Sequence, residues 1–483
     1  MHLLAAQPGE FVDEEGIIDL QQTPGDIVIL SAADDTLALL ASVAESLSDN
    51  YPTVRLANFI NLNKPAAFDL YRHQVLDHAK IIILYLLGGE SYWQYGLEQL
   101  VEWAEENPSR HLIVVPGEDA ENRDLMNRST EEFESVHRVW RYLREGTEHN
   151  ANQLYRFIGQ EYFHQATPWV EPKSLPSVQI YYSGEKNTTL DACRHRWETE
   201  QPVALLLFYR NHLQTGNTQV FDEFITCLEK QKLNVLPIAV ASLKDSTCVE
   251  VINHLANQTK PRIIINTTGF AAQGRHLTDA LSLTQTTKPL FSVDVPVLQV
   301  MMSSTTKEAW EEHSAGLRPR DIAMHIALPE LDGRIITRAV SFKAAKRFSE
   351  HCQIDIIQYE LHHERAQFVA ELAYRWSQLS HKPNNQKRLG LILANYPTRD
   401  GRIGNGVGLD TPASTINIIK QLVQAGYSLG EDIPNTGNSL IERLQGSVTN
   451  NLDTVDLLPC WQSIDIHTYN KYFLQLPLEN QQA

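Results

Sequence analysis

The chain has 483 residues, of which 42% are hydrophobic and 21% charged, a composition ordinary for a globular protein of several domains. Its 59 acidic residues outnumber the 41 basic ones and give a formal net charge of −18. This balance argues against a general binder of nucleic acid or of anionic membranes, although a local group of arginines can still hold a small anionic ligand.

Cysteine spacing and the first residues indicate the compartment. The five cysteines form no CxxC pair, so a zinc ribbon is not supported and reduced thiols are expected. The opening stretch MHLLAAQPGEFVDEEG has no basic region before an apolar run, so no signal peptide is expected. No apolar run approaches the length of a membrane span. We therefore expect a cytoplasmic protein.

The first region alternates apolar runs with helical segments. Strands are predicted at residues 27–32, 54–59, 81–87 and 111–116, with helices at 35–48, 65–78 and 95–106 between them. This alternation is typical of a parallel sheet. Residues 129–160 form an amphipathic helical region that is broken at 146–152, and the proline-containing stretch 167–176 is the best linker candidate.

A second region repeats the alternation. Strands are predicted at 177–182, 203–209, 233–240, 262–267 and 296–300, with helices at 220–230 and 248–258. Two of these strands lead directly into polar loops, 210–217 and 267–271, placed where ligands meet parallel sheets. Gly269 would let the backbone of the second loop approach a ligand closely.

The segment Pro329-Glu330-Leu331-Asp332-Gly333-Arg334 is predicted as a turn in an apolar surrounding. Two readings of its carboxylates stay open. In one, Glu330 or Asp332 forms a salt bridge with Arg334 or Arg338 at a surface turn. In the other, a carboxylate with a raised pKa accepts protons or touches a metal.

Residues 358–378 are predicted as a helix that contains His362-His363-Glu364. The position four residues beyond His363 is Gln367, so the paired histidines of a zinc-protease helix are missing and these residues are interpreted as solvated. A second linker is expected at 380–387.

The stretch LGLILANYPTRDGRIGNGVGLDTPAS, residues 389–414, combines a predicted buried strand at 389–393 with a glycine-rich loop. Asp410 or Thr411 could cap a following helix at 413–425. Such a loop can present backbone N–H groups, here at Gly404 and Gly406, to an anionic ligand. The spacing matches neither the dinucleotide fingerprint nor a Gly-Lys-Ser/Thr phosphate loop, so a loop that only turns the chain is the alternative.

Several segments together resemble the large subunit of aerobic cobaltochelatase (CobN), in the wider family of the magnesium chelatase H subunit. The matching segments include LLGGESYWQYGLEQL, ALLLFYRNHLQTGNTQVFD, NTTGFA, LPELDGRIITRAVSFK and LANYPTRDGRIGNGVGLDTPAS. The family's subunit is much longer, so this chain resembles its N-terminal portion. The resemblance implies ATP-dependent insertion of Co²⁺, as substrate, into the tetrapyrrole hydrogenobyrinic acid a,c-diamide in cobalamin biosynthesis. It also implies that AAA+ partner subunits hydrolyse the ATP.

The resemblance also selects site residues. Glu330 and His212 are the candidates for the base and for metal delivery, and Asp332 is a third catalytic candidate. Positive partners for the acidic side chains of the tetrapyrrole would be Arg210, Arg334, Arg399 and Arg402, with Gly269, Gly404 and Gly406 as further substrate contacts. His212 could equally be a core histidine that hydrogen-bonds the backbone.

The predicted fold class is α/β, with tandem Rossmann- or flavodoxin-like parallel-sheet units and added helices. Domains are expected at 1–167, 177–380 and 388–483, the last being the start of a third α/β domain. Three rival functions remain: a tetrapyrrole- or metal-binding module without catalysis, a subunit of a magnesium or other metal chelatase, and a nucleotide-sugar transferase or periplasmic-type sensor.

Overall fold

A computed structural model of the chain describes residues 3–5, 16–185, 188–272, 289–312, 314, 316–394, 403–430, 432–449, 453 and 455–482. The chain divides into two compact units, residues 1–377 and 378–483. The first unit holds two large sheets, and its mixed α/β architecture confirms the predicted fold class. Within the described residues, no helix is both long and apolar enough to span a membrane.

The first large sheet has four parallel strands in the order β4-β3-β5-β6. Its buried strands lie where the apolar runs predict them: β3 (Ile27–Ser31), β4 (Val54–Asn58), β5 (Ile81–Leu86) and β6 (His111–Pro116). Because both faces are covered, all residues of β3 and β5 are buried. A small parallel pair, β1 (Leu3–Ala5) and β2 (Ile17–Asp19), precedes this sheet.

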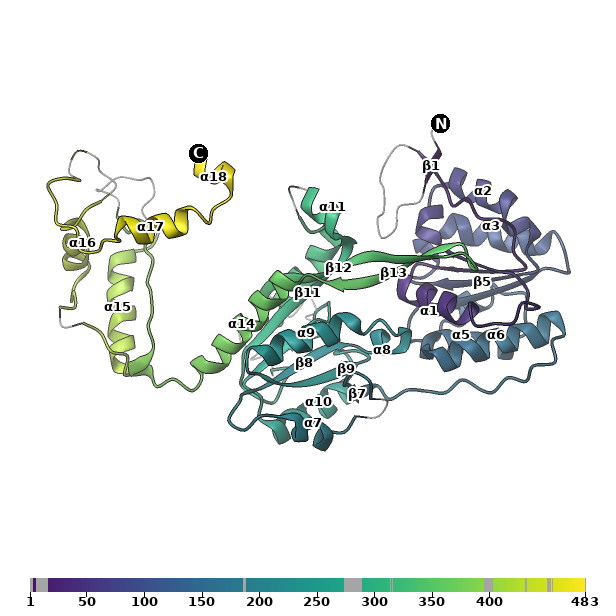
Figure 1. The fold of residues 1–483 in the computed structure, drawn as a ribbon, viewed down its shortest axis with the longest axis horizontal. Helices are drawn as coiled ribbons and strands as arrows, with labels where there is room; N and C mark the ends of the chain where they lie inside the picture. Colours follow the sequence, from purple (N-terminus) through teal and green to yellow (C-terminus); the bar gives the residue numbers. More distant parts are fainter. Residues whose placement is uncertain are drawn as a thin grey trace. The chain divides into compact units, whose positions relative to one another are not determined.

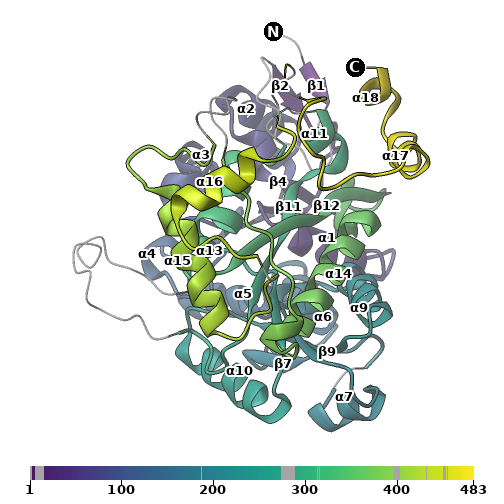
Figure 2. The ribbon, with the colours of Figure 1, turned by 90° about the vertical axis from the view of Figure 1, so that its left-hand side faces the viewer.

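Helices cover both faces of this sheet (Figures 1 and 2). One face packs against α1 (Asp34–Ala44), α5 (Phe133–Glu145) and α6 (Thr147–Phe163), and the other against α2 (Pro65–Gln74) and α3 (Gln94–Glu105). The predicted break in the helical region falls at Gly146, whose φ of +57° is in the left-handed region, and the helix resumes at Thr147. The short elements are η1 (Phe59–Leu62), η2 (Leu76–His78), η3 (Glu90–Tyr92) and α4 (Arg123–Met126).

The second large sheet has seven strands in the order β13-β12-β11-β10-β8-β9-β7. Its five central strands run parallel, and the two edge strands run antiparallel to their neighbours. The strands are β7 (Val178–Ile180), β8 (Val203–Tyr209), β9 (Asn234–Val240), β10 (Ile263–Asn266), β11 (Val297–Thr306), β12 (Ile335–Ser349) and β13 (Ile354–Leu361). The predicted strand at 177–182 is thus an edge strand, and the one at 296–300 extends further.

Two groups of helices cover the second sheet. One face carries α9 (Gln219–Lys230) and α14 (His363–Leu379), and the other carries α7 (Leu190–Arg196) and α10 (Ser246–Thr259). The remaining elements of this unit are α8 (Asn211–Thr215), α11 (Lys307–Glu312), α12 (Pro319–Ile322), the π-helix η5 (Ala323–Ala327) and α13 (Leu328–Glu330).

The helix predicted at 358–378 is wrong in its first turn. Residues up to Leu361 belong to β13, which pairs with β12 from Ser341↔Leu361 to Ser349↔Ile354, and the helix begins at His363. The run IDIIQYEL is rich in β-branched and aromatic residues, which suit a strand, and pairing with β12 outweighs helical propensity there.

The β12–β13 hairpin reaches from the second sheet to the first. At its tip Cys352 and Ile356 are buried in the core of the first sheet, and the Leu56 backbone N–H donates to the Cys352 carbonyl at 3.5 Å. Arg347 forms two hydrogen bonds, at 2.6 and 2.7 Å, with Glu45, the residue directly after the last residue of α1. The hairpin therefore joins the two sheets into one unit.

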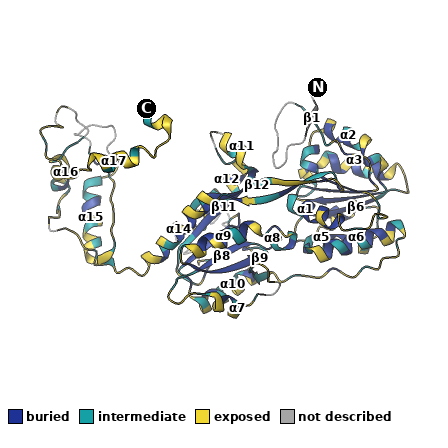
Figure 3. Cartoon of the chain, viewed as in Figure 1, coloured by how far each residue is buried: buried dark blue, intermediate teal, exposed yellow. Residues whose placement is uncertain are grey.

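Residues 378–483 contain η6 (Asn384–Gln386), α15 (Thr411–Gln424), α16 (Gly437–Gln445), α17 (Ile466–Phe473) and α18 (Leu478–Gln482). The Asp410 carboxylate accepts from the Ala413 N–H at 3.0 Å, which confirms the predicted cap of α15. Among the large apolar side chains described in this unit only Ile416 and Leu440 are buried, and in Figure 3 its helices are mostly teal and yellow.

The strand predicted at 389–393 is wrong. Residues 389–394 form no strand, and Ile392 is fully exposed, with 97% of its surface open. Since the described residues of 378–483 form no other strand, the run has no neighbour to satisfy its backbone groups as a sheet would.

Truncating the hairpin tip should loosen the junction between the two sheets. We expect Ile356→Ala to lower the free energy of unfolding by about 2–4 kcal/mol, because it removes a buried side chain from the first core. Phe348→Ala, in the same hairpin but 48% exposed, should change it by less than about 0.5 kcal/mol. Urea unfolding of both variants checks this, and equal losses would contradict the role given to the tip.

Candidate functional site

A cavity of about 520 Å³ lies where the carboxyl ends of strands from both large sheets face each other. The first sheet contributes residues that follow β5 and β6, and the second contributes residues that follow β8, β9 and β10. Ligands of doubly wound sheets bind at such edges, and the volume suits a small-molecule site. Arg210 and Gly269, predicted from widely separated loops, both line this cavity.

Arg210 follows β8 and is only 7% exposed. Its Nη1 group donates to the carbonyls of Leu175 and Pro176, at 3.0 and 3.2 Å, so it ties the end of the predicted linker to the loop after β8. Its Nε group has no hydrogen-bond partner among the described residues. The guanidinium thus brings a positive charge to the cavity wall, while its Nε atom is buried.

The sequence reasoning missed other charged residues that line the same cavity. Arg144 and Lys244 contribute positive charge, while Glu118 and Asp119 contribute negative charge. Lys244 lies four residues after the end of β9 at Val240, so its place after a parallel strand was a usable signal. Arg144 comes from α5, where nothing in the sequence distinguishes it from other arginines on the helix.

Gly269 approaches another part of the same chain. A Cβ atom at this position would lie 3.3 Å from both the His325 ring and the Met324 carbonyl, so a larger residue would press on the π-helix η5. The Phe270 N–H donates to Met324 O at 2.7 Å, and the Tyr209 hydroxyl donates to Gly269 O at 3.1 Å. In this structure the close approach is to η5, and the approach of Gly269 to a ligand stays a prediction.

Asp332 and Arg334 form a buried ion pair, with 2.7 Å between Oδ2 and Nη2 and side chains 4% and 2% exposed. Asp332 also accepts from the Ala272 N–H at 2.8 Å, and Arg334 donates to Gln299 Oε1 at 3.0 Å. Burial lowers the pKa of Arg334, and the Asp332 carboxylate opposes that effect. Of the two readings of the turn, a salt bridge is present, although it is buried.

The ion pair belongs to a wider hydrogen-bond network under the 268–272 loop. Asn266 donates to Gln299 Oε1 at 2.7 Å and to Thr268 O at 3.0 Å, and Gln299 also donates to Thr268 O, at 2.9 Å. Asp332 and Arg334 therefore hold the loop that forms one wall of the cavity. By contrast the Glu330 carboxylate, in the same turn, is exposed, has no partner in the described part of the chain and does not line the cavity.

His212 lies in α8 but does not line the cavity. Its ring is 6% exposed and packs against the rings of Phe221 and Tyr359, with centroids 4.8 and 5.6 Å away. Burial lowers the pKa of His212, and Asp35 opposes the shift. Its Nδ1 atom has no hydrogen-bond partner among the described residues, so a backbone bond from this atom, the alternative considered for His212, is not formed.

The glycine-rich loop lies in the second unit. Arg399 and Arg402 fall outside the described residues. Gly404 has a φ of +69°, and its N–H donates to Ala394 O at 3.0 Å, while Gly406 forms an isolated bridge with Leu409. These contacts close a compact turn ahead of α15.

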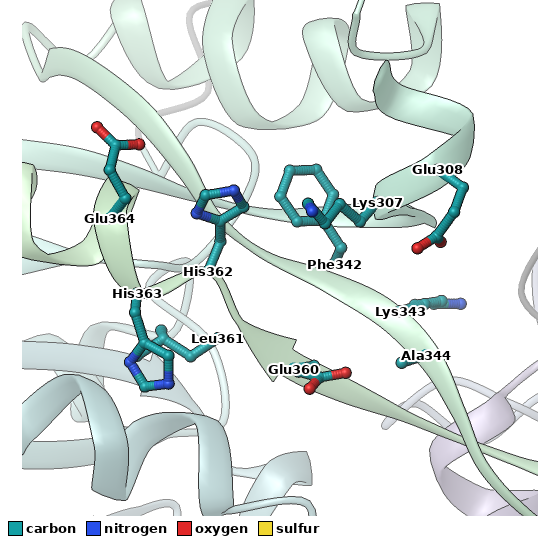
Figure 4. Close-up of a pocket in the computed structure, with 10 residues that line it drawn as sticks. All are labelled: Lys307, Glu308, Phe342, Lys343, Ala344, Glu360, Leu361, His362, His363 and Glu364. Carbon is teal, nitrogen blue, oxygen red and sulfur yellow. The ribbon is translucent and has the colours of Figure 1, made fainter. Parts of the chain in front are cut away.

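A second cavity, of about 470 Å³, surrounds His362, whose ring lies beside Phe342 (Figure 4). The rings of His362 and His363 point in opposite directions in this view. Across the described residues, no three His, Cys, Asp or Glu side chains gather into a group that could hold a metal. A metal brought to Glu330 or His212 would therefore have to complete its coordination with other ligands.

Comparison with known proteins gives consistent matches. Residues 140–483 match the family described as CobN/Magnesium Chelatase. The whole chain is 46% identical to the aerobic cobaltochelatase subunit CobN of Pseudomonas aeruginosa, covering 38% of that protein. Over 99% of the chain it is 34% identical to the CobN subunit of Sinorhizobium sp., covering 37% of it. The chain thus spans less than two fifths of the length of these curated relatives.

A solved structure agrees with the sequence matches. The catalytic subunit of cobaltochelatase from Mycobacterium tuberculosis superposes with a TM-score of 0.57 at 27% identity, over 94% of this chain and 35% of that one. The similarity therefore extends over nearly all of both units in sequence and in fold.

The two carboxylates of the 329–334 turn should differ sharply in their effect on stability. We expect Asp332→Asn to lower the free energy of unfolding by about 3 kcal/mol or more, because Arg334 keeps its buried charge and loses its partner. The matched control Glu330→Gln should cost less than about 0.5 kcal/mol, because that side chain is exposed. Chemical denaturation of the two variants measures the free energy of unfolding of each. If Asp332→Asn loses no more than Glu330→Gln, the structural role given to Asp332 is wrong.

The buried imidazole predicts a pH dependence. The pKa of His212 is lower in the folded than in the unfolded chain, so below about pH 6.5 unfolding takes up a proton and the folded state loses stability. As pH falls from 7.5 to 5.5, the free energy of unfolding should therefore decrease more in the wild type than in His212→Gln. His325, whose pKa burial also lowers, is present in both proteins and cancels. A difference that stays constant over this range would contradict the assignment.

Proposed function

The chain belongs to the CobN/magnesium chelatase family, and from this premise we propose that it is the tetrapyrrole-holding part of an ATP-dependent cobaltochelatase. In this proposal Co²⁺ and hydrogenobyrinic acid a,c-diamide are the substrates, and the reaction belongs to cobalamin biosynthesis in the cytoplasm. AAA+ partner subunits would hydrolyse the ATP. The identity of 46% over the whole chain with the CobN subunit of P. aeruginosa is the observation that carries the proposal.

We place the tetrapyrrole in the cavity between the two sheet edges. Its volume of about 520 Å³ suits part of a large ligand with the remainder exposed to solvent. Arg210 and Lys244 line the cavity and supply positive charge for the acidic side chains of the pigment. Arg334 would act indirectly, by fixing the 268–272 loop.

Insertion has to take up the proton that the ring nitrogens release and strip water from the cation. A carboxylate oxygen suits both the transfer of a proton and the binding of a divalent cation. We assign this task first to Glu330, because its carboxylate is exposed and has no partner among the described residues. Asp332 is a weaker candidate because its carboxylate is committed to Arg334 and to the Ala272 N–H.

His212 remains the second candidate base. Burial lowers its pKa and so favours the neutral imidazole, which can accept a proton. Since it packs between Phe221 and Tyr359, a proton from the substrate would reach it only after the surrounding side chains move. Contacts of Arg399, Arg402, Gly404 and Gly406 with the substrate stay a prediction.

An absorption titration tests the ligand assignment. Wild-type protein should shift the spectrum of hydrogenobyrinic acid a,c-diamide more strongly than that of a porphyrin. Arg210→Gln should raise the Kd about tenfold, because it removes a charged donor near the acidic groups. Arg194→Gln, a substitution of an exposed arginine on α7, is the control and should leave the Kd unchanged. No spectral shift with either pigment would overturn the proposed function.

Insertion assays separate holding the pigment from catalysis. With AAA+ partner subunits, ATP and Co²⁺ present, Glu330→Gln should bind the pigment normally yet insert cobalt at least 100-fold more slowly, the range expected for loss of a general base. His212→Ala tests the second candidate in the same assay. Binding without insertion by the wild type would instead favour a binding module, and faster insertion of Mg²⁺ would favour a magnesium chelatase.

A further inference from the structure

Phe270 has a backbone conformation that bulky residues rarely adopt. Its φ is +64°, in the left-handed region where Cβ crowds the following carbonyl and where glycine or asparagine is usually found. The residue lies in the 268–272 loop and lines the cavity between the two sheets. A phenylalanine at such a position is strained, and strain of this kind clusters at ligand-binding sites.

Hydrogen bonds on every side impose this conformation. The Phe270 N–H donates to Met324 O at 2.7 Å, and Gly269 O on one side accepts from the Tyr209 hydroxyl at 3.1 Å. On the other side the Ala272 N–H donates to the buried Asp332 carboxylate at 2.8 Å. The loop is therefore held by groups fixed in the core, and the Phe270 backbone cannot relax without breaking them.

The strain does not serve to bury the ring. Phe270 remains 39% exposed, whereas the phenylalanines that fill the cores, such as Phe208 and Phe221, are almost completely buried. The Lys244 ammonium lies 5.1 Å from the centroid of the Phe270 ring, and both residues line the cavity. An exposed aromatic ring next to a cation suits a flat apolar ligand that carries anionic groups at its edge.

We propose that Phe270 is a positioning residue whose ring packs against the face of the bound tetrapyrrole, while Lys244 pairs with a carboxylate at the edge of the same pigment. This inference rests on the proposed function and names the contacts by which the cavity recognises its substrate. Glu118 and Asp119 also line the cavity, and Glu118 accepts from the Gly88 N–H at 2.6 Å. The negative charge of Glu118 and Asp119 repels the carboxylates at the edge of the pigment, so that edge is expected to lie at Lys244 instead.

Phe270→Gly separates this role from a structural one. Glycine adopts a positive φ without strain, so the variant should melt no lower than the wild type in the absence of pigment. Its Kd for hydrogenobyrinic acid a,c-diamide should rise at least tenfold, because the stacking surface is lost. Phe270→Leu, which keeps an apolar side chain, should give a smaller rise. Phe348→Leu, at an exposed phenylalanine of the hairpin, is the control and should match the wild type in both measurements.

The charge contact has its own readout. The wild type should bind the acid form of the pigment more tightly than a fully esterified form, and Lys244→Gln should reduce that preference several-fold while affecting the ester little. If the wild type binds the pigment and Phe270→Gly binds it with the same Kd, the inference is overturned. A lower melting temperature in Phe270→Gly would also overturn it. In both cases the proposed function still stands. If the wild type binds neither pigment form, the proposed function fails and this inference fails with it.

Discussion

Packing of the β12–β13 hairpin into the first core is the constraint on which the candidate site depends. The hairpin begins as part of the seven-stranded sheet, and at its far end Cys352 and Ile356 are buried with the strands of the four-stranded sheet. Lys343, along the hairpin, binds Asp34 at 2.6 Å at the start of α1, and although burial alone would lower the pKa of Lys343, this carboxylate raises it. The carboxyl edges of the two sheets are thereby held around one cavity.

The wall of that cavity is set by polar groups in the interior. Asp332 and Arg334 form an ion pair that is almost fully buried, and Gln299 and Asn266 satisfy neighbouring donors and acceptors. A buried pair of this kind adds little net stability, since desolvation offsets most of the attraction, but removing one partner leaves a costly charge. Such a network fixes the loop in one conformation, including the left-handed backbone of Phe270.

The candidate residues therefore divide by task. Arg210, Lys244 and Phe270 line the cavity, and Asp332 and Arg334 hold its wall. Glu330 is exposed and His212 is enclosed by aromatic rings, and neither lines the cavity. Family membership gives the chemistry that this arrangement has to serve. The division explains why a turn with two carboxylates can contain both a structural group and a proposed reactive one.

The sequence by itself determined the parallel strands and the fold class, because apolar runs of five to seven residues between amphipathic helices have few other ways to be buried. It also placed Arg210 and Gly269 at strand ends, where the rules of parallel sheets bring loops together. Only the tertiary structure decided which loops meet, because that depends on the β12–β13 hairpin, which begins more than two hundred residues after the last strand of the first sheet and still packs into its core. The β13 strand and the exposed run at 389–394 show the same limit, since strand formation is decided by whether a neighbouring strand is present to pair with, and no local pattern records that.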